Sequence, residues 1–277
     1  MLPEVHLVGV STISEGTPEV TPTKSKPRLS DDQLRDLLEL LEGADTVELK
    51  LTVPDTDRYS ALAALGIDPL DAHIRQVFFF DTPALMLYEH GLVARARRTQ
   101  AKLDDSVVKL RPVVPSEIPP DLRSIQDFGI EVDAMPGGYV CSASYKGQMP
   151  AGRVNDTISG RRPLHKLFSK QQRAFFASHA PDGIELDDLS ILGPINVLKL
   201  KFSPQGFPWK LAVELWNYPS GTRILELSMK CPPGVAFRAV AEARAFLSGS
   251  GINLDGKQET KTRTALAYFS KAIQEGN

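Results

Sequence analysis

The sequence predicts an α+β protein built on an eight-stranded antiparallel β-barrel, a tunnel with helices packed outside it. Six segments alternate apolar and charged side chains with the two-residue period of a β-strand. Amphipathic helical segments separate these strands, and a length of 277 residues suits a single barrel domain, for which roughly 200–250 residues are ordinary. Because charged side chains are rarely buried without partners, so many one-sided charged strands predict a hydrated, charged interior.

Composition narrows the class of protein. An apolar fraction of 42% is ample for a core, and a net charge of −2 argues against general nucleic-acid binding. Cys141 and Cys231 lack C-x-x-C spacing, which is typical of reduced thiols in a cytoplasmic protein. No stretch approaches the ~18 apolar residues of a membrane-spanning helix. We therefore expect a cytoplasmic protein without a membrane partner, and the sequence leaves open whether it is a monomer or a homodimer.

The chain divides into a tail and one domain. Residues 1–29 are rich in Pro, Thr and Ser and predict a disordered N-terminal tail, which leaves residues 30–277 for the tunnel domain. Ser30 is expected to cap a helix that runs to about Glu42, where Gly43 stops it. The first strand is expected to follow at once.

That strand, over residues 44–53, sets the pattern for the others. Glu48 and Lys50 point to one face, and Val47, Leu49 and Leu51 point to the other. Later segments repeat the alternation, and the charged residues of their inward faces are Arg95 and Arg97 (91–98), Lys109 and Arg111 (107–113), Lys199 and Lys201 (197–202), Glu214 (211–216), and Glu226 and Lys230 (224–230).

The remaining segments complete the barrel and its cover. A hairpin is expected around residues 136–138, and the sequence leaves open whether Glu131 and Asp133 line the tunnel or lie on the surface. A Gly-Pro turn is expected between residues 186–192 and the strand that carries Lys199. Other expected elements are a strand over 75–81, a turn over 82–89, a surface excursion over 112–124, and helices over 57–65, 164–178, 234–247 and 259–273.

The inward charges predict an anion-binding cavity. Eight basic residues face three acids in the strands above, so they cannot all pair among themselves, and unpaired buried ions are costly. A linear triphosphate with a divalent metal fits this balance, because Arg and Lys contact phosphate oxygens and carboxylates bind Mg²⁺ or Mn²⁺. The sequence contains no P-loop, no G-x-S-x-G and no metal-ligand spacing of histidines.

These motifs resemble the CYTH superfamily, the triphosphate tunnel metalloenzymes. T-V-E-L-K stands where that family begins with E-x-E-x-K, and residues 78–98 are similar to its D-T-P turn and paired arginines. V-V-K-L-R, E-L-S-M-K and K-T-R (261–263) resemble later motifs, so the resemblance covers about residues 44–268. It implies an eight-stranded tunnel that hydrolyses inorganic triphosphate, thiamine triphosphate, nucleoside triphosphates or RNA 5′ ends, or in one branch cyclises ATP.

The resemblance also implies roles for particular residues. Glu48, Glu214 and Glu226 would bind the metal, with Glu48, Glu226 and Lys50 in the catalytic set. The residues expected to hold phosphates are Lys50, Arg95, Arg97, Lys109, Arg111, Lys199, Lys201, Lys230, Lys261 and Arg263. Thr46 and Ser228 stand where the family often has glutamates, which favours as an alternative a module that binds polyphosphate or nucleotide with little turnover.

Overall fold

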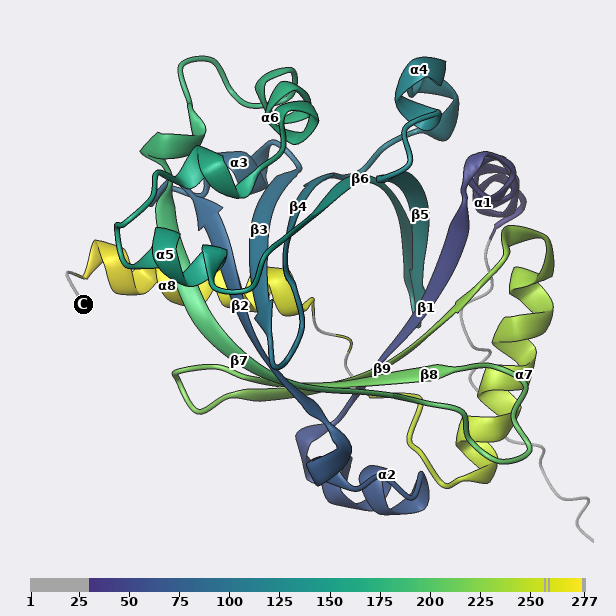
Figure 1. The fold of residues 1–277 in the computed structure, drawn as a ribbon. Helices are drawn as coiled ribbons and strands as arrows, with labels where there is room; N and C mark the ends of the chain where they lie inside the picture. Colours follow the sequence, from purple (N-terminus) through teal and green to yellow (C-terminus); the bar gives the residue numbers. More distant parts are fainter. Residues whose placement is uncertain (1–29, 257, 259, 276–277) are drawn as a thin grey trace, which may run out of the picture.

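The computed structural model describes residues 30–256, 258 and 260–275. Its sheet is a closed barrel in the order β1-β5-β6-β4-β3-β2-β7-β8-β9 (Figure 1). The strands are β1 Thr46–Val53, β2 His73–Asp81, β3 Leu92–Thr99, β4 Asp104–Leu110, β5 Phe128–Met135, β6 Gly138–Met149, β7 Ser190–Phe202, β8 Leu211–Asn217 and β9 Arg223–Cys231. The predicted barrel is therefore confirmed.

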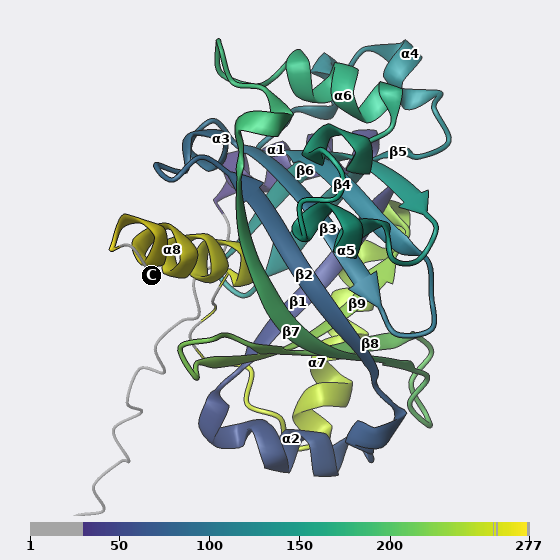
Figure 2. The same ribbon diagram turned by 60° about the vertical axis from the view of Figure 1, so that its left-hand side comes forward.

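Helices connect and cover the strands. The α-helices are α1 Asp31–Gly43, α2 Arg58–Ala64, α3 Met86–Glu89, α4 Pro120–Arg123, α5 Arg153–Ile158, α6 Lys170–Ala177, α7 Ala236–Gly249 and α8 Lys261–Gln274. In Figures 1 and 2, α2 lies at one extremity of the molecule, α4 and α6 lie at the other, and α8 runs beside β2 and β7. Among the described residues, no helix combines the length and the apolar character needed to cross a membrane.

The strand count and one pairing differ from the prediction. The described residues form nine barrel strands, because both arms of the hairpin at residues 136–137 join the sheet. A ring with an odd number of strands cannot alternate direction throughout, so one neighbouring pair must be parallel. That pair is β1 and β5, with Thr46 opposite Glu131 and Glu48 opposite Asp133.

Several predicted boundaries also shift. The helix predicted over 164–178 is divided, because Ser169 caps α6 with its side chain and the preceding residues, Leu164–Leu167, form a 3-10 turn. The Gly-Pro step lies inside β7, where the pairing with β2 is irregular. Strand β4 ends at Leu110, which leaves Arg111 beyond it. The prediction for residues 1–29 falls outside the described residues.

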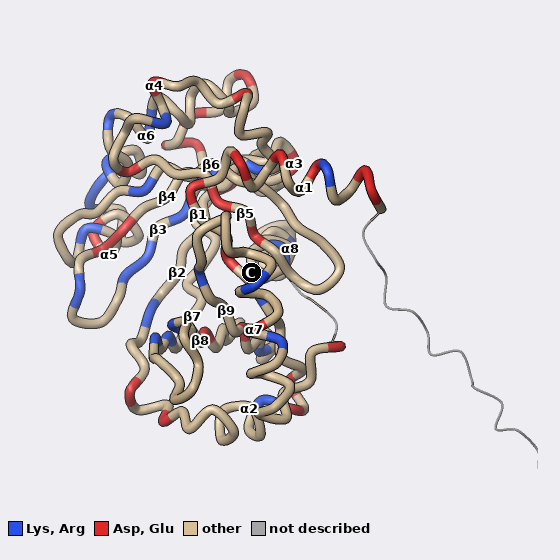
Figure 3. Tube along the Cα trace, turned by 90° about the vertical axis from the view of Figure 1, so that its right-hand side faces the viewer, with Lys and Arg blue, Asp and Glu red and all other residues tan. Residues whose placement is uncertain are grey.

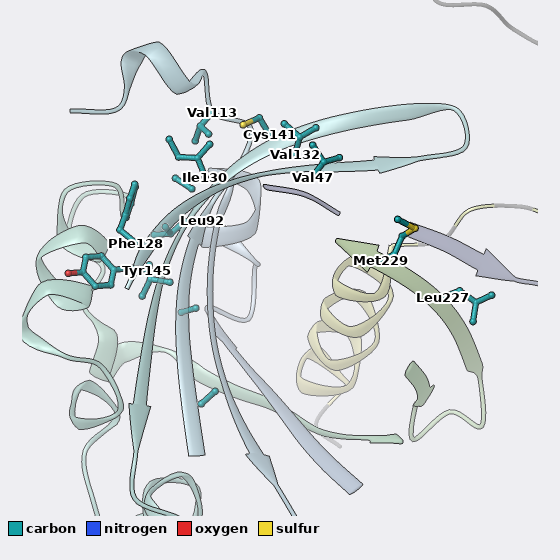
Figure 4. Close-up of a cluster of buried hydrophobic side chains, with 14 of the residues drawn as sticks. Val47, Leu92, Val113, Phe128, Ile130, Val132, Cys141, Tyr145, Leu227 and Met229 are labelled. Carbon is teal, nitrogen blue, oxygen red and sulfur yellow. The ribbon is translucent and has the colours of Figure 1, made fainter. Parts of the chain in front are cut away.

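The apolar strand faces point outward and pack under the helices. Phe128 and Tyr145 are buried, and the ring of Phe175 from α6 packs edge-on to Phe128 with centroids 5.7 Å apart. Figure 4 shows this cluster extending along β5 and β6 to Val132 and Cys141. Each such buried side chain contributes about 1.5–3 kcal/mol by leaving water. The opposite, inward face is therefore free to carry charge.

Candidate functional site: a charged barrel interior

Ion pairs that reach over a strand show that the charged faces converge. Lys109 on β4 lies 3.3 Å from Asp133 on β5 although β6 runs between them. Arg75 on β2 likewise lies 3.9 Å from Glu214 on β8, across β7. Such contacts need side chains on the same face of the sheet, and because the apolar outer face packs under the helices, both pairs lie inside the closed barrel. Figure 3 shows acidic and basic positions distributed along the barrel strands.

Three carboxylates meet where β1 pairs with β5. One oxygen from each of Glu48, Glu131 and Asp133 lies within 4.8 Å of the others. The parallel register explains the group. It places the even-numbered residues of β1 beside the odd-numbered residues of β5 on the inward face. We call these three residues the acidic triad. The structure thus answers the open question about the hairpin acids, which line the barrel interior.

Lysines surround the acidic triad. Lys50 Nζ lies 2.7 Å from Asp133 Oδ1 and 3.4 Å from Glu48 Oε2. Lys230 contacts Glu131 and lies 3.8 Å from Glu48 Oε2, with its side chain half exposed. The negative charge of the acidic triad is therefore compensated by lysines of β1 and β9.

The pKa values in this cluster follow from burial and from these neighbours. Burial alone would raise the pKa of Glu48, but Lys50 and then Lys230 outweigh it and lower the pKa to about 2. Burial opposes ionisation of Asp133 too, yet Lys109 and Lys50 lower its pKa. For Glu131, burial and then the charge of Glu48 raise the pKa. Two of the three carboxylates are thus firmly ionised.

A second group of acids lies around Lys261, at the start of α8. Lys261 Nζ lies 2.5 Å from Glu214 Oε2 and 2.6 Å from Glu226 Oε1, and it sits 4.9 Å from the centre of the Trp216 ring. Lys199 contacts the other oxygen of Glu214. Helix α8 is therefore connected to the barrel interior through an ammonium shared by two carboxylates.

Burial and the neighbouring charges shift the pKa values of this second group in opposite directions. Burial favours the neutral form of Glu214, but Lys261 and Lys199 hold its pKa well below the usual value. The pKa of Glu226 remains raised, because burial there exceeds the effect of Lys261. The pKa of Lys261 is raised by Glu226 and Glu214 in spite of burial.

Arginines from β2 and β3 form the third part of the interior. Arg97 Nε donates to Asp105 Oδ1 at 2.6 Å, and Arg75 Nε donates to Thr99 Oγ1 at 3.1 Å. The Nε of Arg95 is buried and has no hydrogen-bond partner. Burial, followed by the like charge of Arg97, lowers the pKa of Arg95. A buried guanidinium with an unused donor is suited to an anionic ligand.

One end of the interior is apolar, which the sequence analysis did not predict. Val77, Phe79 and Val93 lie on the same strand faces as the arginines, because they are cross-strand partners of Arg97, Arg95 and Lys109. They form a buried cluster together with Trp216, Ile224 and two residues of α8, Ala265 and Leu266. Tyr218 Oη donates to the Lys261 carbonyl oxygen at 3.0 Å and holds the start of α8 at this end.

The structure separates the predicted site residues into two sets. Those in or at the rim of the charged interior are Glu48, Lys50, Arg95, Arg97, Lys109, Lys199, Glu214, Glu226, Lys230 and Lys261. Lys201 and Arg263 are exposed, and Arg111 lies beyond the end of β4, so none of these three belongs to the ion-paired groups described above. Lys201 follows the inward alternation, but it lies one residue before β7 ends, beyond the part of β7 that pairs with β2.

Four interior residues were not among the predicted site residues. Arg75 was missed because its strand otherwise carries Val77 and Phe79 on that face, so no charge repeats there. Asp105 precedes the segment predicted as a strand. Glu131 and Asp133 show the required spacing of two, and only their pairing partner was unknown. A strand beginning at Asp104 would have identified Asp105 by its alternation with Lys109.

The acidic triad fits a hard divalent cation. It offers three carboxylate oxygens, the donors that Mg²⁺ and Mn²⁺ prefer. Asp133 Oδ1 is buried and accepts no well-oriented hydrogen bond, although Lys50 lies at ion-pair distance. Glu214 and Glu226 are instead committed to Lys261, so within the described residues the group of three acids that could share one ion is the triad.

Comparison with known proteins gives the fold a second line of support. No family model matches the sequence, and no curated protein matches it. A solved structure from Hippeastrum, of a candidate adenylyl cyclase whose dominant activity is that of a triphosphatase, matches with a TM-score of 0.59 and 15% identity over 80% of this chain and 95% of that one. A candidate adenylate cyclase from Bacillus halodurans matches with a TM-score of 0.54 and 13% identity, over 79% and 98% of the two chains. The chain therefore shares the fold of these two proteins.

Proposed function

We propose that the protein hydrolyses a small triphosphate inside the barrel in a reaction that depends on Mg²⁺ or Mn²⁺. The observation that carries the proposal is the presence in one interior of three clustered carboxylates and of Arg95, whose buried Nε has no hydrogen-bond partner. The Hippeastrum protein, which has the same fold, is described as a triphosphatase. Phosphoryl transfer depends mostly on positioning and charge neutralisation, which is what this interior offers.

The residues divide into two roles. We assign the acidic triad as the metal ligands, in place of the predicted set Glu48, Glu214 and Glu226. When bound there, a divalent cation would neutralise phosphate charge and polarise the phosphoryl oxygens. Arg95, Arg97 and Lys109 lie on the inward faces of β3 and β4 and would contact the phosphate oxygens, with arginine offering two parallel hydrogen bonds.

Two lysines that pair with the acidic triad would also contact phosphate once the metal is bound. Lys50 and Lys230 already pair with the acidic triad, so an incoming cation takes over part of their charge compensation. The released ammonium groups are then free to contact phosphate. Anion and metal would therefore bind together more tightly than either alone, because each relieves a charge that the other leaves uncompensated.

Phosphate release tests the proposal directly. Inorganic triphosphate, ATP and thiamine triphosphate are incubated with the protein and Mg²⁺ or Mn²⁺, and orthophosphate and cyclic AMP are measured. We expect orthophosphate from at least one substrate and its loss in Glu131→Gln. Calorimetric binding without any product would contradict hydrolysis and favour a binding module, and cyclic AMP from ATP would favour cyclisation.

A further inference from the structure

Large apolar side chains gather on the outer surface where α1 lies next to the start of α7. Helix α1 packs against the 3-10 turn Pro233–Val235, which leads directly into α7, and Figure 1 shows both helices on the same side of the molecule. The exposed side chains there, which we call the apolar patch, are Leu34 and Leu38 of α1, Val235 of the turn, and Phe237 and Val240 of α7. A cluster of exposed apolar side chains with a polar surround is typical of an interaction site.

Packing against the barrel does not account for the apolar patch. The side of α1 that faces the core carries Leu41, and the corresponding side of α7 carries Leu247 and three alanines. The two patch residues of α1 are four positions apart and those of α7 are three apart, so each pair forms a second apolar row on its helix. A surface helix usually carries polar residues outside its core-facing row. The two additional rows are therefore available to another surface.

The charges around the apolar patch have opposite signs on the two helices. On α7, Arg238 pairs with Glu242, whereas Arg244 is exposed and makes no ion pair with any described residue. On α1, Arg35 pairs with one acid, Asp32, and the other acids have no basic partner in the described chain. The exposed acids of α1 are Asp31, Asp32, Asp36, Glu39 and Glu42. The α1 side of the patch is therefore acidic, and the α7 side carries a free basic group.

A surface with acids on one side of an apolar centre and a base on the other is complementary to its own copy. A two-fold axis through the apolar patch brings the patches of two chains together, with α1 of each chain facing α7 of the other. The apolar side chains are then buried at the centre and the unpaired charges meet at the rim, which is the usual anatomy of a protein interface. A partner with charges of a single sign would match one side of this surface and repel the other.

We propose that the protein forms a two-fold symmetric homodimer through the apolar patch. Phe237, which at 53% is the most exposed residue of the patch, packs at the centre against the partner's Leu38. Arg244 lies seven positions after Phe237 on the same face of α7, and Glu42 lies four positions after Leu38 on the same face of α1. Arg244 of each chain therefore meets the partner's Glu42 at the rim. The dimer does not depend on the hydrolytic function proposed above.

Sedimentation velocity of the full chain over about 1–100 μM measures the dissociation constant of the dimer. Phe237→Asp places a charge at the apolar centre, and we expect the dissociation constant to rise at least about 10-fold. Tyr59→Asp is the matched control, because it makes the same kind of change at a side chain that is 73% exposed on α2, and it should leave the constant unchanged. Circular dichroism verifies that both variants remain folded.

A charge exchange tests the two-fold arrangement itself. Arg244→Glu places like charges opposite each other at the rim, and we expect it to weaken the dimer at least about 10-fold. Adding Glu42→Arg to the same chain restores opposite charges in both halves of a two-fold dimer. The dissociation constant of this double variant should return to within about 3-fold of the wild-type value, since the two residues act as a pair.

Three results would overturn the proposal: a wild-type chain that is monomeric at about 100 μM, a dissociation constant that Phe237→Asp leaves unchanged, or a double variant that does not recover. For a monomeric wild type, the fluorescence of an added apolar dye identifies what occupies the patch instead. Weaker dye fluorescence in Phe237→Asp than in the wild type would show a patch that is open to a different partner. Equal fluorescence would show that the chain covers the patch itself.

Discussion

Lys261 places its ammonium 2.6 Å from the carboxylate of Glu226 and so links α8 to β9. The same nitrogen reaches Glu214. Removing it leaves two buried acids without their shared partner, and breaking a buried pair in this way costs about 3–5 kcal/mol. We expect Lys261→Met to lower the free energy of unfolding by that amount in urea denaturation at pH 8. Lys271→Met, at a side chain that is 75% exposed, should cost under about 0.5 kcal/mol.

The loss in Lys261→Met should depend on pH. Burial already raises the pKa of Glu226, and without the lysine this pKa would lie further above that of the unfolded chain. A group with a raised folded-state pKa stabilises at low pH and destabilises as pH rises through its unfolded value. The variant should therefore differ less from the wild type at pH 5 than at pH 8. In the wild type, the lowered pKa of Glu214 has the opposite effect, and its stabilising contribution is lost as the pH falls. Equal losses at both pH values would contradict the shared-partner interpretation.

Glu131→Gln tests the acidic triad as a metal site. The change keeps the size of the side chain and removes one charge, and we expect Mn²⁺ affinity to fall at least about 10-fold, since even outer-shell partners cost 10–100-fold. Calorimetric titration with Mn²⁺ measures this without any substrate. Asp127→Asn serves as the control, because Asp127 is exposed just before β5 begins. Unaltered Mn²⁺ affinity in Glu131→Gln would remove Glu131 from the ligand set.

Arg95→Met should separate ligand binding from stability. The buried guanidinium has an unused Nε donor, so its replacement by an apolar side chain should leave the free energy of unfolding unchanged or raise it by about 1 kcal/mol. Binding of inorganic triphosphate should weaken about 10-fold or more, which corresponds to one charge-assisted hydrogen bond. Arg98→Met is the matched control, since Arg98 lies on the other face of β3 and bonds Gln76. A variant that is strongly destabilised would show that Arg95 is structural.

Trp216 should report ligand binding by fluorescence. Its Nε1 donates to Glu214 at 2.9 Å, and Lys261 lies over its ring. A phosphate that draws Lys199 or Lys261 toward itself changes the charge beside the indole. The chain has two tryptophans, and Trp209 bonds Glu242 of α7 outside the barrel, so Trp209→Phe isolates the signal. We expect inorganic triphosphate to change emission in Trp209→Phe and not in Trp216→Phe.

Sequence periodicity was sufficient to predict the barrel and most of the inward-facing charged residues, because both follow from the local alternation of apolar and charged side chains. It could not give the pairing partner of β1, which depends on how a ring of strands closes. That unknown decides which acids lie beside Glu48, since Glu48 meets Glu131 and Asp133 through the parallel register. The predicted grouping of Glu48 with Glu214 and Glu226 assumed that all inward acids converge on one point. Lys261, which the resemblance suggests as a phosphate ligand, bridges two of those acids, and its role toward phosphate stays a prediction.

The pairing of β1 with β9 bears on how the protein is made. Thr46 and Cys231, joined by a side-chain hydrogen bond, are 185 positions apart, so the ring can close only after β9 has left the ribosome. Contacts between such distant segments make folding slow. Shortened translation products that lack β9 would leave one edge of β1 unpaired, and an unpaired strand edge favours aggregation. A fragment that ends before β9 is therefore expected to aggregate more readily than a chain that includes β9.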